Sequence, residues 1–241
     1  VKLFFGVESI KNASSIIGRY RRLLIVTGRS SAERSGALKD VKTILEENGV
    51  EYEVWSRGFP NPTDTLVDEL TNVYREGLFE GLIAVGGGSI IDLAKAVRVL
   101  TVGGGEISEY IYGLREVPEH KPFLLAVNLT HGTGSEIDRY AVITISEKKE
   151  KLGFNAGYPT VSIDDPRYTV TLPRDQTIYT TMDAFAHAVE SATSNQSSPY
   201  TVSLAREVVE KIVNHLPKVL ENLSSLIDRY WLLYASMIAG I

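Results

Sequence analysis

Residues 82–92 read LIAVGGGSIID, an apolar run followed by three glycines and the start of a second apolar pattern. The run 82–85 predicts a buried strand, and the apolar spacing of residues 90–100 predicts a helix. Glycines between them allow a close approach of the backbone to a ligand, and the N–H groups at a helix start favour a phosphate. The stretch therefore predicts a phosphate-binding turn, with a plain tight turn as the alternative.

Ser89 and Asp92 carry two interpretations of this turn. Ser-x-x-Asp is close to a capping box, in which Ser89 caps the helix and Asp92 reaches back to it. The Ser89 hydroxyl is also placed to meet a cofactor. We expect both interpretations to hold together.

Strands and helices alternate along the first half of the chain, which is typical of an α/β fold with a parallel sheet. The first predicted strand ends in Gly28-Arg29-Ser30-Ser31, without the common G-x-G-x-x-G fingerprint. Phosphate binding and ribose recognition are therefore divided between two strand ends, which can meet at one edge of a doubly wound sheet. The predicted strands are 23–27, 50–55, 82–85 and 123–128, and the predicted helices are 35–48, 66–74 and 90–100.

From Pro173 onward the pattern becomes helical, with helices predicted at 174–180, 182–191, 201–220 and 226–241. We therefore expect a dinucleotide-binding α/β domain over residues 1–172. Residues 173–241 are expected to be the start of a helical metal-binding domain. Residues 230–241 are apolar almost all round, so this helix needs partners on every side, and we expect the helical domain to be incomplete in this chain.

The composition excludes several classes of protein. With 241 residues, 44% of them hydrophobic, and a net charge of −5, the chain resembles a soluble globular protein and gives no reason to expect nucleic acid as a partner. No apolar run is long enough to span a bilayer, and the apolar N-terminal stretch is too short for a signal peptide. The absence of cysteine excludes disulfides and thiolate metal sites. We expect a cytoplasmic protein, and the apolar helical tail would allow a homodimer.

Asp183 and His187 are four residues apart on a predicted helix, so their side chains emerge on the same face. A carboxylate and an imidazole in this arrangement suit a divalent metal. The alternatives are an Asp–His hydrogen bond and a helix cap at Asp183. His131 lies in the small-residue loop 130–136, which is either a ligand contact or a structural turn.

Taken together, these segments resemble the iron-containing (group III) alcohol dehydrogenase family. The resemblance lies in the order and spacing of GGGS with Asp92, GTGSE at 132–136 and MDAFAHAVE at 182–190, and of Asp165-Pro166 before Leu172-Pro173. It implies a Rossmann-like N-terminal domain, an all-helical C-terminal domain and an active site in the cleft between them. It further implies a metal, iron or zinc, bound by Asp183, His187 and two histidines beyond residue 241.

The resemblance also implies a nicotinamide cofactor, with the pyrophosphate at Gly87, Gly88 and Ser89. The nicotinamide side would be met by loop 130–133 and by Lys151. Family members usually carry alanine where His131 stands, so this chain departs from the pattern there. The predicted cofactor-binding set is Gly28, Arg29, Ser30, Ser31, Gly86, Gly87, Gly88, Ser89, Asp92, Thr130, His131, Thr133, Ser135 and Lys151.

The end of the first strand bears on the choice of cofactor. Family members that prefer NAD tend to carry an acidic residue there, whereas this chain has Arg29 followed by two serines. An arginine with two hydroxyls suits a 2′-phosphate, so we expect NADP(H) to be preferred over NAD(H).

The predicted reaction is reversible hydride transfer between a small alcohol or aldehyde and this cofactor. No catalytic side chain is assigned. One alternative is a related-fold glycerol or glycerol phosphate dehydrogenase, or a dehydroquinate synthase-like enzyme. The absence of Lys and Arg between Asp183 and Pro199 disfavours a phosphate-bearing substrate. The other alternative is a non-catalytic nucleotide-binding fragment.

Overall fold

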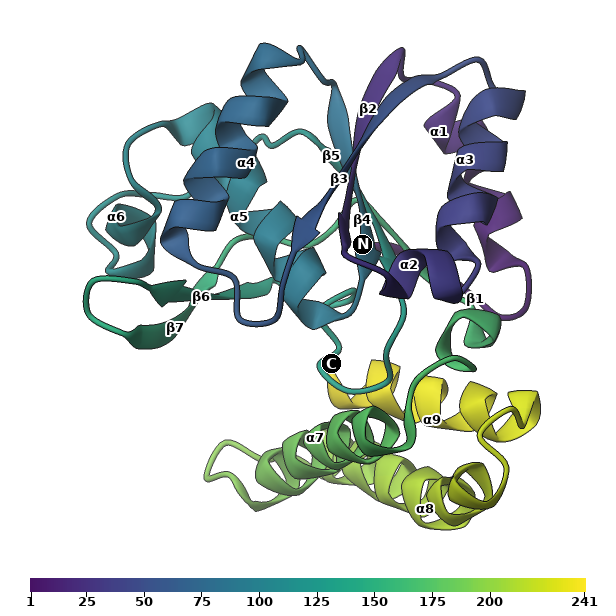
Figure 1. Cartoon of the computed structure of the whole chain (residues 1–241). Coiled ribbons are helices and arrows are strands. Elements are labelled where there is room, and N and C mark those ends of the chain that lie inside the picture. The colour runs from purple at the N-terminus through teal and green to yellow at the C-terminus, as the bar shows by residue number, and fades with distance from the viewer.

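The computed structural model describes residues 1–241, and its first part is built on a six-stranded parallel sheet (Figure 1). The strand order is β1-β8-β5-β4-β2-β3, so the chain runs outward from β2 to β3 and then returns to the other side of β2 with β4. The strands are β1 (Lys2–Phe5), β2 (Arg22–Gly28), β3 (Glu51–Gly58), β4 (Gly81–Gly86), β5 (Phe123–Asn128) and β8 (Val161–Asp164).

The central strands are apolar because both faces of the sheet are covered. Every residue of β4 and β5 is buried, and such continuous runs are characteristic of parallel sheets between two helical layers. Alternate residues serve opposite faces. In β4, Leu82 and Ala84 join one core cluster, whereas Ile83 and Val85 join the other.

Helices cover both faces of the sheet (Figure 1). One face carries α4 (Asp64–Glu76), α5 (Gly88–Gly103) and α6 (Ile107–Ile111), with the antiparallel hairpin β6 (Tyr140–Ile145) and β7 (Glu150–Asn155) packed beside them. The other face carries η1 (Ser9–Ala13), α1 (Ser14–Ile17) and α3 (Ala37–Glu47). The short α2 (Ser31–Arg34) and η2 (Pro166–Thr169) lie near the carboxyl ends of the strands.

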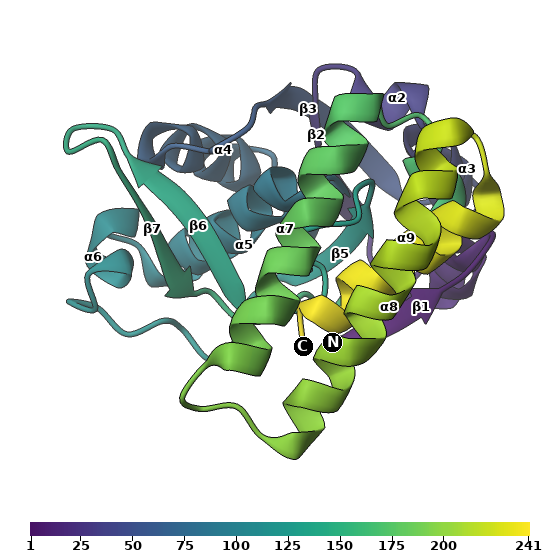
Figure 2. The same ribbon diagram turned by 90° about the horizontal axis from the view of Figure 1, so that it is seen from below.

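The remaining chain forms a layer of three helices below the sheet, with a core of its own (Figures 1 and 2). These helices are α7 (Arg174–Thr193), α8 (Pro199–Glu221) and α9 (Leu226–Ala239). Helix α9 also packs against η2, which connects the helical layer to the sheet.

The predicted fold class, a Rossmann-like α/β part followed by helices, is confirmed. The prediction of separate helices at 174–180 and 182–191 is wrong, because α7 runs through Thr181 without a break. The Thr181 hydroxyl donates to the Thr177 carbonyl and stays compatible with the helix. Strands β1 and β8 were not predicted, since each has only four residues. None of the helices has both the length and the apolar character needed to cross a membrane.

Candidate functional site

A cavity of about 660 Å³ opens at the carboxyl ends of β2, β3, β4 and β5 and is closed on the other side by the start of α7. It lies where the connections from β2 and β4 diverge, which is the switch point at which open α/β sheets collect ligands. The cavity is lined by Gly28, Arg29, Ser30, Ser31, Arg34, Gly58, Phe59, Pro60, Gly87, Gly88, Ser89, Ile90, Leu129, Thr130, Thr133, Tyr168, Thr171, Leu172, Pro173, Gln176 and Thr180.

The glycine turn forms one wall of the cavity. Gly87 is the N-cap of α5, and the backbone hydrogen bonds of the helix begin with Ile90 donating to the Gly87 carbonyl. The N–H groups at the start of the helix are therefore free for a ligand. A Cβ on Gly87 would lie 2.8 Å from Thr130 Cγ2, and one on Gly88 would lie 2.5 Å from Thr133 Oγ1. Glycine at both positions lets loop 130–133 approach the helix start.

The capping-box interpretation of Ser89 and Asp92 is wrong. The helix starts one residue before Ser89, whose Oγ accepts a hydrogen bond from Asn61 N at 3.3 Å. The Asp92 carboxylate turns away from the helix start, where Ser135 Oγ donates to it at 2.5 Å and Val142 N at 3.1 Å. Burial raises the pKa of Asp92 to about 6. Ser89 lines the cavity, whereas Asp92 supports the chain behind it.

The end of β2 forms the second wall. Gly28, Arg29, Ser30 and Ser31 all line the cavity, and both Arg29 and Ser30 are exposed. Arg34, in the last turn of α2, adds a second guanidinium to the same wall. The sequence analysis did not predict Arg34 as a site residue, although it follows Arg29 by five residues across a short polar segment. No acidic side chain lines the cavity.

The loop after β5 forms the third wall through Thr130 and Thr133. Asn128, buried at the end of β5, holds this loop, because its Oδ1 accepts from Thr130 N at 3.0 Å and from Thr130 Oγ1 at 3.3 Å. Gly86 ends β4 and is buried behind the turn, so it does not line the cavity.

His131 does not face the cavity. It is fully buried, and Arg229 Nη1 donates to its Nε2 at 3.0 Å. Because an arginine can only donate, Nε2 is the acceptor and the proton sits on Nδ1, which lies 3.0 Å from Thr181 Oγ1. Burial, with Arg229 nearby, lowers the pKa of His131 to about 3. The predicted cofactor contact of His131 is therefore replaced by a structural one.

Arg229 is also fully buried, and every partner it has is neutral. Besides His131, its guanidinium donates to Thr177 Oγ1 at 2.8 Å, to the Leu223 carbonyl at 3.0 Å and to the Leu172 carbonyl at 3.3 Å. Burial lowers the pKa of Arg229 to about 10, so it remains a cation at neutral pH. One side chain of α9 thus connects the loop after β5, the start of α7 and the segment between η2 and α7.

Ser135 and Lys151, the other predicted cofactor residues, also lie outside the cavity lining. Ser135 is buried between Asp92 and the fully buried Lys95, whose Nζ donates to Ser135 Oγ, to Asp138 Oδ1 at 2.8 Å and to the Tyr140 carbonyl. Lys151 is exposed on β7, where it pairs with Thr144 in the hairpin. The hairpin packs on α5 and α6, away from the start of α7.

Asp183 and His187 lie together on α7, with Asp183 Oδ1 3.9 Å from His187 Nε2. Each side chain is partly exposed, 46% for Asp183 and 38% for His187. The spacing of Gln176, Thr180, Asp183 and His187 keeps all four near one face of the helix, and the first two line the cavity. The pair therefore continues the stripe of α7 that begins in the cavity wall.

The pair fits a divalent metal by its donor chemistry. Two ligand atoms of a tetrahedral site, each about 2.1 Å from the metal, lie about 3.4 Å apart, so a small rotation of these partly exposed side chains from their 3.9 Å separation would let both coordinate. Neither side chain is engaged in a hydrogen bond with another residue, so the oxygen and nitrogen lone pairs are free to coordinate. Two ligands make half of a tetrahedral site, and no group of three or more His, Cys, Asp or Glu side chains in the structure is placed to hold a metal ion.

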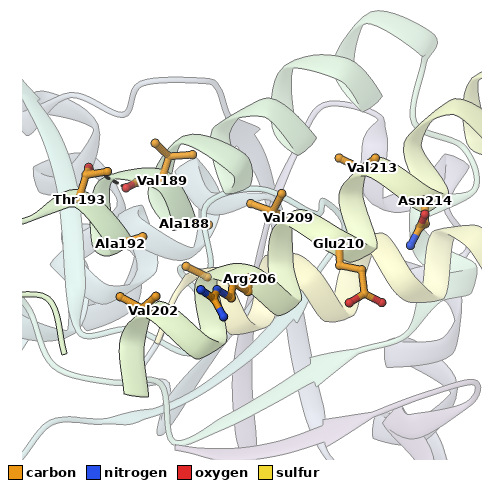
Figure 3. Close-up of a pocket in the computed structure, with 11 residues that line it drawn as sticks. Ala188, Val189, Ala192, Thr193, Val202, Arg206, Val209, Glu210, Val213 and Asn214 are labelled. Atoms are coloured by element: carbon orange, nitrogen blue, oxygen red, sulfur yellow. Dashed lines mark hydrogen bonds between the residues drawn. The ribbon is translucent and has the colours of Figure 1, made fainter. Parts of the chain in front are cut away.

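A second hollow of about 550 Å³ lies between α7 and α8 (Figure 3). Its walls are mostly apolar, with Ala188, Val189 and Ala192 from α7 facing Val202 and Val209 from α8. It carries no cluster of titratable side chains suited to chemistry. The polar cavity at the sheet edge is therefore the candidate active site.

Comparisons with known proteins point to one family. The sequence model described as iron-containing alcohol dehydrogenase matches residues 1–166, and the one described as Fe-containing alcohol dehydrogenase family, C-terminal, matches residues 177–241. A long-chain primary alcohol dehydrogenase of Thermoanaerobacter ethanolicus is 40% identical over 99% of this chain and 61% of its own length. An NAD-dependent methanol dehydrogenase of Bacillus methanolicus is 33% identical over 92% of this chain and 58% of its own.

Solved structures give the same result. The crystal structure of an iron-containing alcohol dehydrogenase from Thermotoga maritima superposes with a TM-score of 0.92 and 33% identity, over 100% of this chain and 66% of the other. An NADH-dependent butanol dehydrogenase from the same organism gives 0.93 and 30%, over 99% of this chain and 61% of the other. The chain spans about 60% of the length of the curated relatives it matches.

Proposed function

This chain belongs to the iron-containing alcohol dehydrogenase family, and from that premise we propose that it supplies the cofactor site and part of the metal site of an alcohol dehydrogenase. The reaction would be reversible hydride transfer between a small alcohol or aldehyde and a nicotinamide cofactor. Residues 1–172 would form the dinucleotide-binding domain, and residues 173–241 the start of the metal-binding domain.

The observation that carries the proposal is the cavity at the switch point of the sheet, with the helix start of α5 exposed in its wall. Gly87, Gly88 and Ser89 would bind the pyrophosphate through backbone N–H groups, aided by the helix dipole. Thr130 and Thr133 pack directly against this turn and would contact the cofactor on its nicotinamide side. The cofactor carries the hydride, and the protein holds it in place and orients it.

A preference for NADP(H) is part of the proposal. Arg29 and Arg34 line the cavity together with Ser30 and Ser31, and this wall would receive the ribose that carries the 2′-phosphate. Arginine binds phosphate through charge-assisted hydrogen bonds, and no lining carboxylate would repel a 2′-phosphate.

Asp183 and His187 would hold the metal. A bound divalent iron or zinc ion would polarise the substrate oxygen. The free oxygen of Asp183 and nitrogen of His187 supply two ligands on the face of α7 that begins in the cavity wall. We expect His187→Ala to lower the metal content of the protein after loading with zinc, measured by elemental analysis. The matched control is His120→Ala, on an exposed loop, which should retain the metal.

The test of the proposed function is the rate of NADPH oxidation with a short aliphatic aldehyde, using protein loaded with ferrous iron or zinc without oxygen. We expect a metal-dependent rate that is lower with NADH. A metal-free protein that turns over at the same rate, or NADH used as efficiently as NADPH, would contradict the corresponding part of the proposal. Tight cofactor binding without turnover would favour a non-catalytic nucleotide-binding role.

A further inference from the structure

Glu136 and Asp164 are two carboxyl groups in the interior that the proposed reaction does not use. Both are fully buried. Neither oxygen of the Glu136 side chain has a hydrogen-bond partner, and Asp164 Oδ2 has none either. Leaving a buried carboxylate oxygen unpaired is costly, so these groups need an explanation.

The fold brings the segment that carries Glu136 against the strand that carries Asp164, near enough for the charge of Asp164 to act on the Glu136 carboxyl. Ser162 and Asp164 are two residues apart on β8 and therefore share a face of the strand. Ser162 Oγ donates to the Glu136 carbonyl, so the segment that carries Glu136 lies against this face. Asp164 Oδ1 accepts from Asn128 Nδ2 at 3.0 Å, which leaves Oδ2 free for another partner.

No cation neutralises this pair. The charge of Lys95 acts on Glu136, but the three hydrogen bonds of its ammonium group go to Ser135, Asp138 and Tyr140. Asp138 adds a further negative charge near Glu136. On the other side of β8, Asp165 is paired with Arg167, which also reaches Asp40 and Glu8. Two ionised carboxylates would therefore repel each other in a site without solvent.

The pKa values agree with this geometry. Burial raises the pKa of Asp164 to about 7. Burial also raises the pKa of Glu136 well above its usual range, and the negative charge of Asp164 adds to the rise. When two carboxyl groups share one site, a single proton commonly serves both, because the second charge is strongly disfavoured.

A continuous chain of hydrogen bonds leads from the pair to the cavity. Asn128 donates to Asp164 with its amide nitrogen and accepts from Thr130 N and Oγ1 with its amide oxygen. Thr130 lines the cavity directly beside Gly87. The orientation of the Asn128 amide is thus fixed at one end by Asp164 and sets Thr130 at the other.

We propose that Glu136 and Asp164 share one proton at neutral pH and that this protonated pair positions Asn128 and Thr130 in the wall of the cofactor cavity. The Glu136 carboxyl donates the proton to Asp164 Oδ2, and Asp164 Oδ1 remains the acceptor for Asn128. Loss of the proton leaves two adjacent negative charges, which push Asp164 away from Asn128 and release Thr130. Both carboxyl groups are positioning residues, and their effect on cofactor binding rests on the proposed function.

The shared proton is tested on the protein alone, without cofactor. Infrared spectra recorded across a pH series should contain the C=O band of a protonated carboxylic acid at neutral pH. Combining Glu136→Gln with Asp164→Asn in one protein should remove this band, whereas Glu119→Gln, at an exposed position, should leave it unchanged. Spectra with carboxylate bands only at neutral pH would refute the shared proton. A band that survives both substitutions would refute its assignment to this pair.

The positioning role is tested by the amide resonance of Thr130 and by NADPH affinity. In the unmodified protein, the Thr130 resonance should shift with the same midpoint as the infrared band, and Glu136→Gln should abolish the shift. As the pH rises and the pair ionises, the NADPH affinity of the unmodified protein should fall about fivefold or more, measured against the affinity of Glu136→Gln at the same pH. If the Thr130 resonance does not change with pH, the proposed link between the carboxyl pair and the cavity wall is refuted. If the Thr130 resonance shifts but NADPH does not bind at any pH, the link between the proton and the Thr130 loop is supported and the proposed cofactor is rejected.

Discussion

Single residues of this chain divide between the cavity wall and the interior that supports it. Thr130 and His131 are adjacent, yet Thr130 lines the cavity and His131 points into the boundary between the sheet and the helices. Neighbouring residues point in opposite directions here because the loop passes between the sheet and the helical layer. A polar residue next to a site is therefore not by itself a ligand contact.

Replacing His131 tests its structural role. In His131→Ala, the buried guanidinium of Arg229 loses an acceptor, and Thr181 loses the group that donates to it. We expect the free energy of unfolding to fall by about 1–3 kcal/mol, the usual cost of a buried group left unpaired. Urea denaturation measures this directly. His120→Ala, at an exposed position, should stay within about 0.5 kcal/mol of the original protein. Equal stability of the two variants would contradict the structural role.

Arg29 tests the preference for the 2′-phosphate. Arg29→Ala should raise the KM for NADPH about 10- to 100-fold while changing that for NADH little, because a charge-assisted hydrogen bond to phosphate is lost. The matched control is Arg19→Ala, which removes an exposed arginine just before β2, at the opposite edge of the sheet. Steady-state kinetics with both cofactors gives the answer. An equal rise in the KM for NADPH and for NADH would show that Arg29 does not contact the 2′-phosphate.

At the scale of elements, the contact between α5 and the loop after β5 shapes the site. The helix start and the loop approach so closely that only glycine fits at Gly87 and Gly88. The helix itself is strongly apolar and buried on most sides, so its position is fixed by the core. The site is thus built from a rigid helix and a loop that is held by Asn128.

Gly88→Ala should disturb this contact. Its Cβ would lie 2.5 Å from Thr133 Oγ1, so Thr133 must move and the loop must open. We expect NADPH affinity to fall about tenfold or more, as measured by cofactor fluorescence, because the phosphate-binding turn depends on close backbone approach. Gly153→Ala, whose Cβ meets only ordinary contacts in β7, should bind NADPH normally. Unchanged affinity in Gly88→Ala would argue against phosphate binding at this turn.

At the scale of the whole molecule, the sheet and the helical layer are joined by buried polar groups as well as by apolar contacts. Arg229 on α9 reaches the loop after β5, α7 and the Leu172 carbonyl. Glu136 and Asp164 lie in the interior close to the same boundary, since Gly134 touches Gly240 at the end of α9. The cavity therefore depends on how these two layers are held together.

The buried carboxyl pair makes a prediction for the stability of the whole chain. The pKa of Asp164 rises from 3.8 to about 7 on folding, so the folded state binds more protons than the unfolded state between these values. The contribution of this group to the free energy of unfolding should therefore fall as pH rises from about 4 to about 7 and then level off.

Urea denaturation across this pH range measures the slope. Removing the coupling with Glu136→Gln should make the slope shallower and should stabilise the variant relative to the original protein above neutral pH. Glu119→Gln, which is exposed, serves as the control and should follow the original curve. A Glu136→Gln variant with an unchanged slope would contradict the buried pair as its source.

The fold class and three walls of the candidate site could be predicted from local sequence. Apolar runs, glycine and helical spacing are properties of neighbouring residues, so they identify β4, the turn at Gly87 and the stripe of α7. The same reasoning predicted that the ends of β2 and β5 line the site, because the carboxyl ends of parallel strands meet at one edge of the sheet. The ordered set of motifs also gave the family.

Only the tertiary structure decided which polar side chains face the cavity and which support it. Asp92, His131 and Ser135 lie outside its lining, because their partners are Val142, Arg229 and Lys95, far along the chain. Arg34, Tyr168 and Thr180 enter the wall for the opposite reason, since packing brings α2, η2 and α7 to the strand ends. Local patterns determine which element forms and which face is apolar. The direction of a polar side chain depends on the charges and hydrogen-bond partners that folding places around it.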